Sequence, residues 1–85
     1  MPVVFRDGRL RYFFFSNEGL QREPRHIHVK GGGKDAKVWL EPLVTIAESY
    51  GFNSIELARI LRVVSERRDV ILRAWDEHFG DGGSL

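Results

Sequence analysis

The chain contains no cysteine, which excludes disulfide bonds and thiolate metal sites. It also has almost no excess charge, because 13 basic residues stand against 12 acidic ones, so no global field directs it to nucleic acid or to a membrane. No apolar run approaches the length of a membrane span, and the first residues lack the basic start and apolar stretch of a signal peptide. We therefore expect a cytoplasmic protein without membrane association.

The length and composition predict one small globular domain. The chain has 85 residues, of which 42% are hydrophobic and 29% charged, values that are ordinary for a globular protein with one modest core. No internal repeat is present. We expect a single domain over residues 1–80 and a disordered tail over residues 81–85, beyond Gly80.

The first half of the chain has the alternating pattern of β-strands. Asp7-Gly8 separates two such segments, and because both residues tolerate positive φ, a hairpin with its turn at this dipeptide is predicted. A polar loop over 16–24 follows. Pro42 ends the last strand, because proline cannot donate to the ladder. Four strands are expected, over about 3–6, 9–15, 25–30 and 36–41, the last two joined by a flexible glycine-rich turn over 31–35.

The second half has a helical rhythm. A short helix over 43–50 is predicted, stopped by Gly51. Asn53 and Glu56 have capping-box spacing and open a second helix that could run to Phe79, with a possible break over 66–69, where every side chain is polar. Its apolar stripe comprises Leu57, Leu61, Val64, Ile71, Trp75 and Phe79. The predicted fold class is α+β: four short antiparallel strands with the helices on one sheet face.

The most informative stretch is His26-Ile27-His28, within a predicted strand. Side chains alternate along a strand, so both imidazoles point from one face and Ile27 and Val29 from the other. Apolar residues take the core face. The two histidines are therefore expected on the opposite face, where they need not be buried.

The turn at Asp7-Gly8 sets the register of the first hairpin, so that Phe5 pairs with Leu10 and Val3 with Tyr12. The predicted core face then carries Val3, Phe5, Leu10, Tyr12, Phe14, Ile27, Val29, Ala36, Val38 and Leu40. The other face carries Arg6, Arg9, Arg11, Phe13, Phe15, His26, His28, Lys30, Lys37, Trp39 and Glu41. Three aromatic side chains are too apolar to be left in water, so we expect a partner protein, a second copy, RNA or the loop over 16–24 to cover them.

Two chemistries could use the histidine pair directly. His26 and His28 could bind one metal, with Glu23, Glu41 or His78 as third ligand, although no spacing argues for any of these. They could also act as acid and base in RNA cleavage, with Lys30, Lys37 or an arginine stabilising the developing charge. Neither reading is preferred, and no cofactor is expected. The sequence leaves enzymatic activity open and favours none.

Six short motifs resemble the small bacterial family called domain of unknown function 4160, and together they span nearly the whole chain. They are residues 1–5, 12–18, 24–29, 36–42, 51–52 and 75–79. His26, His28, Trp39 and Trp75 fall on the family's marked positions, whereas Arg25 stands where the family usually has proline and the loop over 18–23 is a little long. The resemblance implies an α+β domain whose gene often lies beside that of a second small domain, as in a toxin–antitoxin pair. It implies no activity.

The leading hypothesis is a small interaction module, one component of a toxin–antitoxin-like pair, that binds a protein encoded nearby or a second copy of itself. The binding residues would be Arg11, Phe13, Phe15, His26, His28, Lys37 and Trp39. The alternatives are a histidine-dependent protein that binds or cleaves RNA, with His26, His28 and Lys30 as candidate catalytic residues, and a metal-binding protein that uses the same histidine pair.

Overall fold

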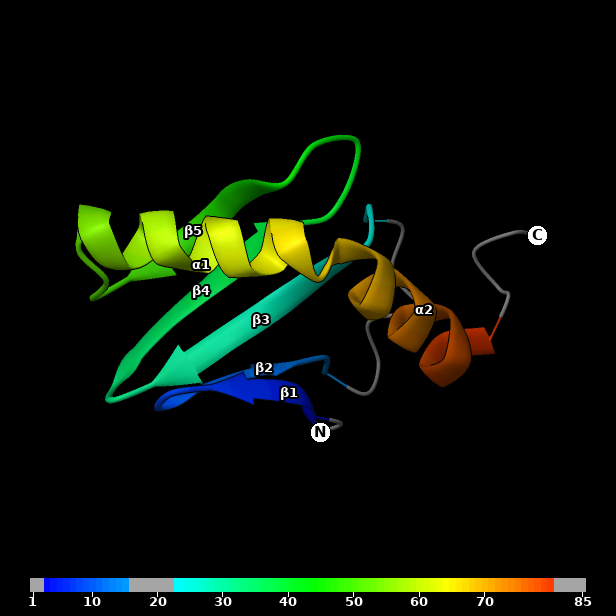
Figure 1. Ribbon diagram of the computed structural model, residues 1–85, viewed down its shortest axis with the longest axis horizontal. Coiled ribbons are helices and arrows are strands. Elements are labelled where there is room, and N and C mark those ends of the chain that lie inside the picture. The colour runs from blue at the N-terminus through cyan, green and yellow to red at the C-terminus, as the bar shows by residue number, and fades with distance from the viewer. Residues whose placement is uncertain (1–2, 16–22, 81–85) are drawn as a thin grey trace.

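The computed structural model describes residues 3–15 and 23–80, and it shows an α+β fold with one five-stranded sheet and two helices (Figure 1). The strands lie in the order β1-β2-β3-β4-β5, each antiparallel to the next. The elements are β1 (Val3–Asp7), β2 (Leu10–Phe13), β3 (His26–Gly31), β4 (Lys34–Trp39), β5 (Thr45–Tyr50), α1 (Ser54–Glu66) and α2 (Arg68–Phe79). The fold class is confirmed, and the predicted number of strands is one too few.

The fifth strand replaces the predicted short helix over 43–50. Ala47 and Glu48 favour a helix, but the β-branched Thr45 and Ile46 favour a strand. Pairing decides between these preferences: Ile46 lies opposite Val38, and the ladder continues to Tyr50 beside Asp35. Local propensity is thus overridden by the hydrogen bonds that the edge of β4 offers.

The first hairpin turns one residue later than predicted. Asp7 pairs with Leu10, so Gly8 and Arg9 form the two-residue turn, and Gly8 has a φ of 63°. Phe5 lies opposite Tyr12 instead of Leu10. This displacement of the partner by two residues leaves Phe5, Leu10 and Tyr12 on their predicted face.

A bulge at the start of β1 changes the face on which Val3 lies. One extra residue separates Val3 from Phe5, so Val3 lies opposite Phe13 and not on the core face. Val3 is 41% exposed, which corrects its predicted place in the core, whereas Val4 packs against the core.

The second hairpin has a two-residue turn, shorter than the predicted turn over 31–35. Gly31 pairs with Lys34, leaving Gly32 and Gly33 as the turn residues, with φ angles of 60° and 77°. Both positive φ values suit a two-residue hairpin turn. Gly31 is required for another reason, because a Cβ there would lie 2.5 Å from the carbonyl oxygen of Arg9.

The helices begin and break where the sequence predicted. Asn53 accepts a hydrogen bond from the Glu56 amide at 2.8 Å, and the Glu56 carboxylate accepts one from the Asn53 amide at 2.9 Å. The predicted break falls at Arg67, whose φ and ψ of −109° and 16° end α1 before α2 begins.

The core lies between the helices and one face of the sheet. Tyr12, Ile27, Val29, Ala36, Val38 and Leu40 supply the sheet side, as predicted. Val64, Ile71 and Trp75 of the predicted stripe are buried, whereas Leu57, Leu61 and Phe79 are only partly buried. The predicted stripe omitted Ile60 and Val63, which are also buried. The buried face of α1 is therefore wider than one row of side chains.

Candidate functional site

The open face is the side of the sheet opposite α1, and it carries the alternate residues of each strand (Figure 1). Ile27 and Val29 are fully buried in the core, and the rings of His26 and His28 lie together, 5.2 Å apart between centroids. The predicted assignment of these residues to two faces is therefore confirmed.

The cation row crosses the open face at its hairpin end and consists of Arg6, Arg11 and Lys30. Arg11 lies directly between the other two, opposite Arg6 on β1 and Lys30 on β3. Asp35 follows Lys30 on β4, but none of the three cations forms an ion pair within the described part of the chain. Like charges on directly opposite residues destabilise a sheet, so this row is a local concentration of unneutralised positive charge.

The neighbouring row of residues lines a hollow of about 260 Å³ in the open face. Phe13, His28 and Lys37 lie side by side on β2, β3 and β4, and Glu48 follows on β5. The hollow is lined by Phe13, Phe15, His28, Lys30, Lys37 and Glu48, among others. Apolar rings and amphipathic lysine stems thus surround a shallow depression next to the cation row.

The aromatic residues are less exposed than predicted. Phe13 is only 2% exposed and Trp39 is half-buried, whereas Phe15 is 37% exposed. Phe13 contacts both Phe15 and His28, with centroid separations of 5.2 and 5.7 Å. The rings largely cover one another, and Phe15 presents the most accessible apolar surface of this group.

Lys37 covers the neighbouring tryptophan. Its Nζ lies 4.6 Å from the Trp39 ring centroid, a cation–π geometry, and 2.8 Å from the Glu23 carboxylate. That hydrogen bond is the main reason why the pKa of Glu23 is lowered. Both Lys37 and Glu23 therefore have partners within the protein, which makes Lys37 a weaker ligand-binding candidate than Lys30.

His26 is fully buried, which corrects the expectation that both histidines are accessible. Its ring contacts those of Trp39 and Trp75, with centroid separations of 5.6 and 5.3 Å. Its Nδ1 lies 2.9 Å from the Pro24 carbonyl oxygen, and since a carbonyl only accepts, Nδ1 is the donor. His28 is half-buried, with its ring 4.5 Å from that of Phe15.

Arg25 links several elements at the end of the open face where His26 is buried, a role that the sequence did not indicate. Its guanidinium binds Glu41 and Asp76, each at 3.1 Å, and its amide also donates to Glu41. These bonds from Arg25 lower the pKa of Glu41. Arg68 adds a hydrogen bond to the Leu40 carbonyl at 2.8 Å, so the ends of β3, β4 and α2 are linked.

The candidate third metal ligands do not gather at the histidine pair. Glu41 is held by Arg25, and His78 lies against Phe79 on α2, 4.5 Å between centroids. Glu23 is held by Lys37, whose hydrogen bond is the main cause of its lowered pKa, and the nearby charges of His26 and His28 lower this pKa further. Within the residues that the structure describes, no group of three His, Cys, Asp or Glu side chains could hold a metal. The same part of the chain has no helix long and apolar enough to span a membrane.

These features define a small α+β domain with one sheet face under helices and the other bearing a cation row and an aromatic hollow. The profile of the family described as domain of unknown function DUF4160 matches residues 10–76, from the start of β2 into the last turn of α2, and the chain belongs to that family. The matched range covers His26, His28, Trp39 and Trp75. No curated protein and no solved structure matches the chain.

Proposed function

We propose that the protein is an interaction module, one component of a toxin–antitoxin-like pair, and that its open face binds an acidic surface of the partner protein encoded beside it. The observation that carries this proposal is the cation row. Arg6, Arg11 and Lys30 lie on three neighbouring strands, and the described residues supply no ion-pair partner for any of them. Carboxylates of a partner would neutralise this charge and remove a repulsion that the free protein retains.

The hollow beside the cation row provides an anchoring position. Interfaces draw most of their binding energy from a few apolar or aromatic side chains that enter depressions, surrounded by polar contacts. Phe15 and His28 line the hollow, and Lys30 belongs to both the hollow and the row. A partner side chain in the hollow and acids above the cation row would therefore bind to one continuous surface.

The histidines support recognition more than catalysis. Cleavage of RNA by two histidines requires both rings to reach the same phosphodiester. His26 is fully buried between Trp39 and Trp75, and only the half-buried His28 borders the hollow. His28 is suited to contact a partner, while His26 supports it from beneath.

The test is a titration of the purified protein with the product of the neighbouring gene, followed by calorimetry. Arg6→Glu should weaken binding by about tenfold or more, because it reverses one of the three charges of the cation row. Arg62→Glu is the matched control: Arg62 is also exposed, but it lies on α1, on the other side of the molecule, and should leave the affinity unchanged.

Other occupants of the open face give different results. Equal losses in Arg6→Glu and Arg62→Glu would show a general charge effect and no specific surface. Concentration-dependent self-association that Arg6→Glu abolishes would identify a second copy as the partner. Binding of labelled single-stranded RNA that exceeds binding of the neighbour, and is lost in the same variant, would replace the proposal with an RNA-binding function.

A further inference from the structure

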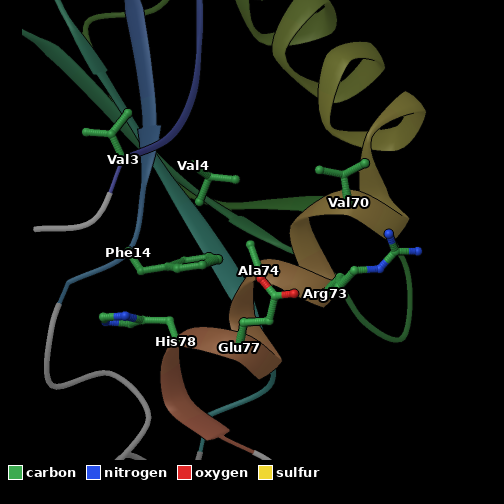
Figure 2. A pocket seen from close by; sticks show the side chains of 8 residues that line it. All are labelled: Val3, Val4, Phe14, Val70, Arg73, Ala74, Glu77 and His78. Atoms are coloured by element: carbon green, nitrogen blue, oxygen red, sulfur yellow. The ribbon is translucent and has the colours of Figure 1, made fainter.

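A groove of about 310 Å³ lies between the start of β1 and α2, away from the open face (Figure 2). Figure 2 shows Val3 and Val4 on one side and Val70 on the other, with the Phe14 ring below the two β1 valines and pointing toward Ala74. Phe14 is fully buried and forms the floor, whereas Val3 and Val70 are 41% and 56% exposed. The groove is therefore apolar and open to solvent.

The strand beside the groove has an unused edge. In the described sheet β1 is the first strand and pairs only with β2, so alternate backbone N–H and C=O groups on its other side point away from the sheet. An extended peptide can pair with such an edge and place alternate side chains in an adjoining pocket. The edge and the groove share Val3 and Val4, so one extended segment could occupy both.

The rim of the groove indicates the charge of such a segment. Arg73 extends from α2 at the rim and is exposed, with no ion pair in the described part of the chain. A carboxylate beside the apolar anchor would find this guanidinium within reach, as arginine prefers carboxylate partners. Glu77 also stands at the rim, so a run of several acids would be disfavoured.

We infer that the edge of β1 and this groove form a second binding site, which takes an extended peptide segment of another protein by strand addition. The segment places one apolar side chain over Phe14 and one acidic residue near Arg73. The groove shares no lining residue with the hollow of the open face. Because Arg6 lies on β1, a substitution on β3 is needed to test the two sites separately.

The experiment selects peptides from a random phage-displayed library on the immobilised full-length protein and measures the affinity of synthetic copies. Peptides that share an apolar residue next to an acid are expected. Val70→Arg should weaken their binding by about tenfold or more, whereas Ile55→Arg, at a more exposed apolar position on α1, should not. Ala74→Arg provides a second block inside the groove, and thermal unfolding of each variant verifies that it folds.

Strand addition has a separate readout in the peptide backbone. N-methylation of alternate peptide amides should abolish binding, and N-methylation of the amides between them should not, because only one set can pair with β1. Lys30→Glu, a cation-row substitution on β3 and two strands from the β1 edge, should leave peptide affinity unchanged while weakening binding at the open face, which separates this inference from the function proposed for the open face. The inference is overturned if no peptide is enriched, if Val70→Arg and Ala74→Arg bind normally, or if N-methylation has no effect. Self-association of the protein that Val70→Arg removes would instead assign the groove to a second copy.

Discussion

The two ends of the open face have the same alternating side chains but opposite surroundings. At the hairpin end Arg6, Arg11 and Lys30 lie next to one another without an ion-pair partner in the described part of the chain. At the other end His26 is fully buried against Trp75 of α2. Strand alternation assigns a side chain to a face, whereas an element from far along the chain decides whether that part of the face is covered. The predictions below test this difference.

The largest effect on stability is expected at Trp75. This side chain joins the core to the end of the open face at which His26 is buried, called the closed end below. Its ring contacts Phe14 at 5.2 Å, His26 at 5.3 Å and Phe79 at 4.4 Å. Trp75→Ala should lower the free energy of unfolding by about 3–5 kcal/mol. Urea denaturation measures the loss, and Arg73→Ala, an exposed position on the same helix, should change it by less than about 0.5 kcal/mol. Similar losses in both variants would mean that α2 does not close this end.

His26 and His28 should contribute differently to the stability of the fold, although they lie on one face of one strand. His26→Ala removes a fully buried ring and its hydrogen bond to Pro24, and should destabilise the fold by about 2–4 kcal/mol. His28→Ala truncates a half-buried ring and should destabilise it by about 1 kcal/mol. Parallel denaturation curves give both values, and equal values would remove the distinction between the two ends.

The Arg25–Glu41 pair should make the stability of the fold decrease at acidic pH. Because Arg25 lowers the pKa of Glu41 in the folded protein, the carboxylate stabilises the fold above the unfolded value of 4.5, and this is lost as the pH falls through the lower folded value. Glu41→Gln should therefore cost up to about 1 kcal/mol near pH 7 and very little at low pH. Unfolding measured across that range tests the sign, with Glu66→Gln as control. A loss that is independent of pH would contradict it.

The smallest effect is expected at the open end. Arg11→Glu places an acid between two cations and should stabilise the fold by about 0.2–1 kcal/mol at low salt, with a smaller gain at high salt. Arg11→Gln should give part of the gain. Thermal unfolding at two salt concentrations provides the measurement, and a destabilised Arg11→Glu would show that the cation row is neutralised within the free protein.

Local chemistry accounts for the parts of the fold that were predicted correctly. The alternation around Ile27 and Val29 follows from strand geometry, the capping box at Asn53 needs only residues three apart, and the break at Arg67 follows from an all-polar stretch. The helix predicted over 43–50 was wrong. A short segment with mixed propensity takes the structure of the neighbour with which it pairs, and here that neighbour is the strand β4.

The sequence predicted which residues make up the candidate site, but it did not predict which of them are accessible to solvent. Apart from Val3, which a bulge displaces, the amino-acid sequence by itself determined which strand residues share a face, because side-chain direction depends on backbone geometry. It also placed the aliphatic residues of β3 and β4 on the core side, because their removal from water drives folding. Only the tertiary structure decided that His26 is buried, that Arg25 joins Glu41 to Asp76, and that no described residue forms an ion pair with the cation row. Burial depends on contacts between residues distant in sequence, and no local pattern encodes the position of α2 at the end of the sheet.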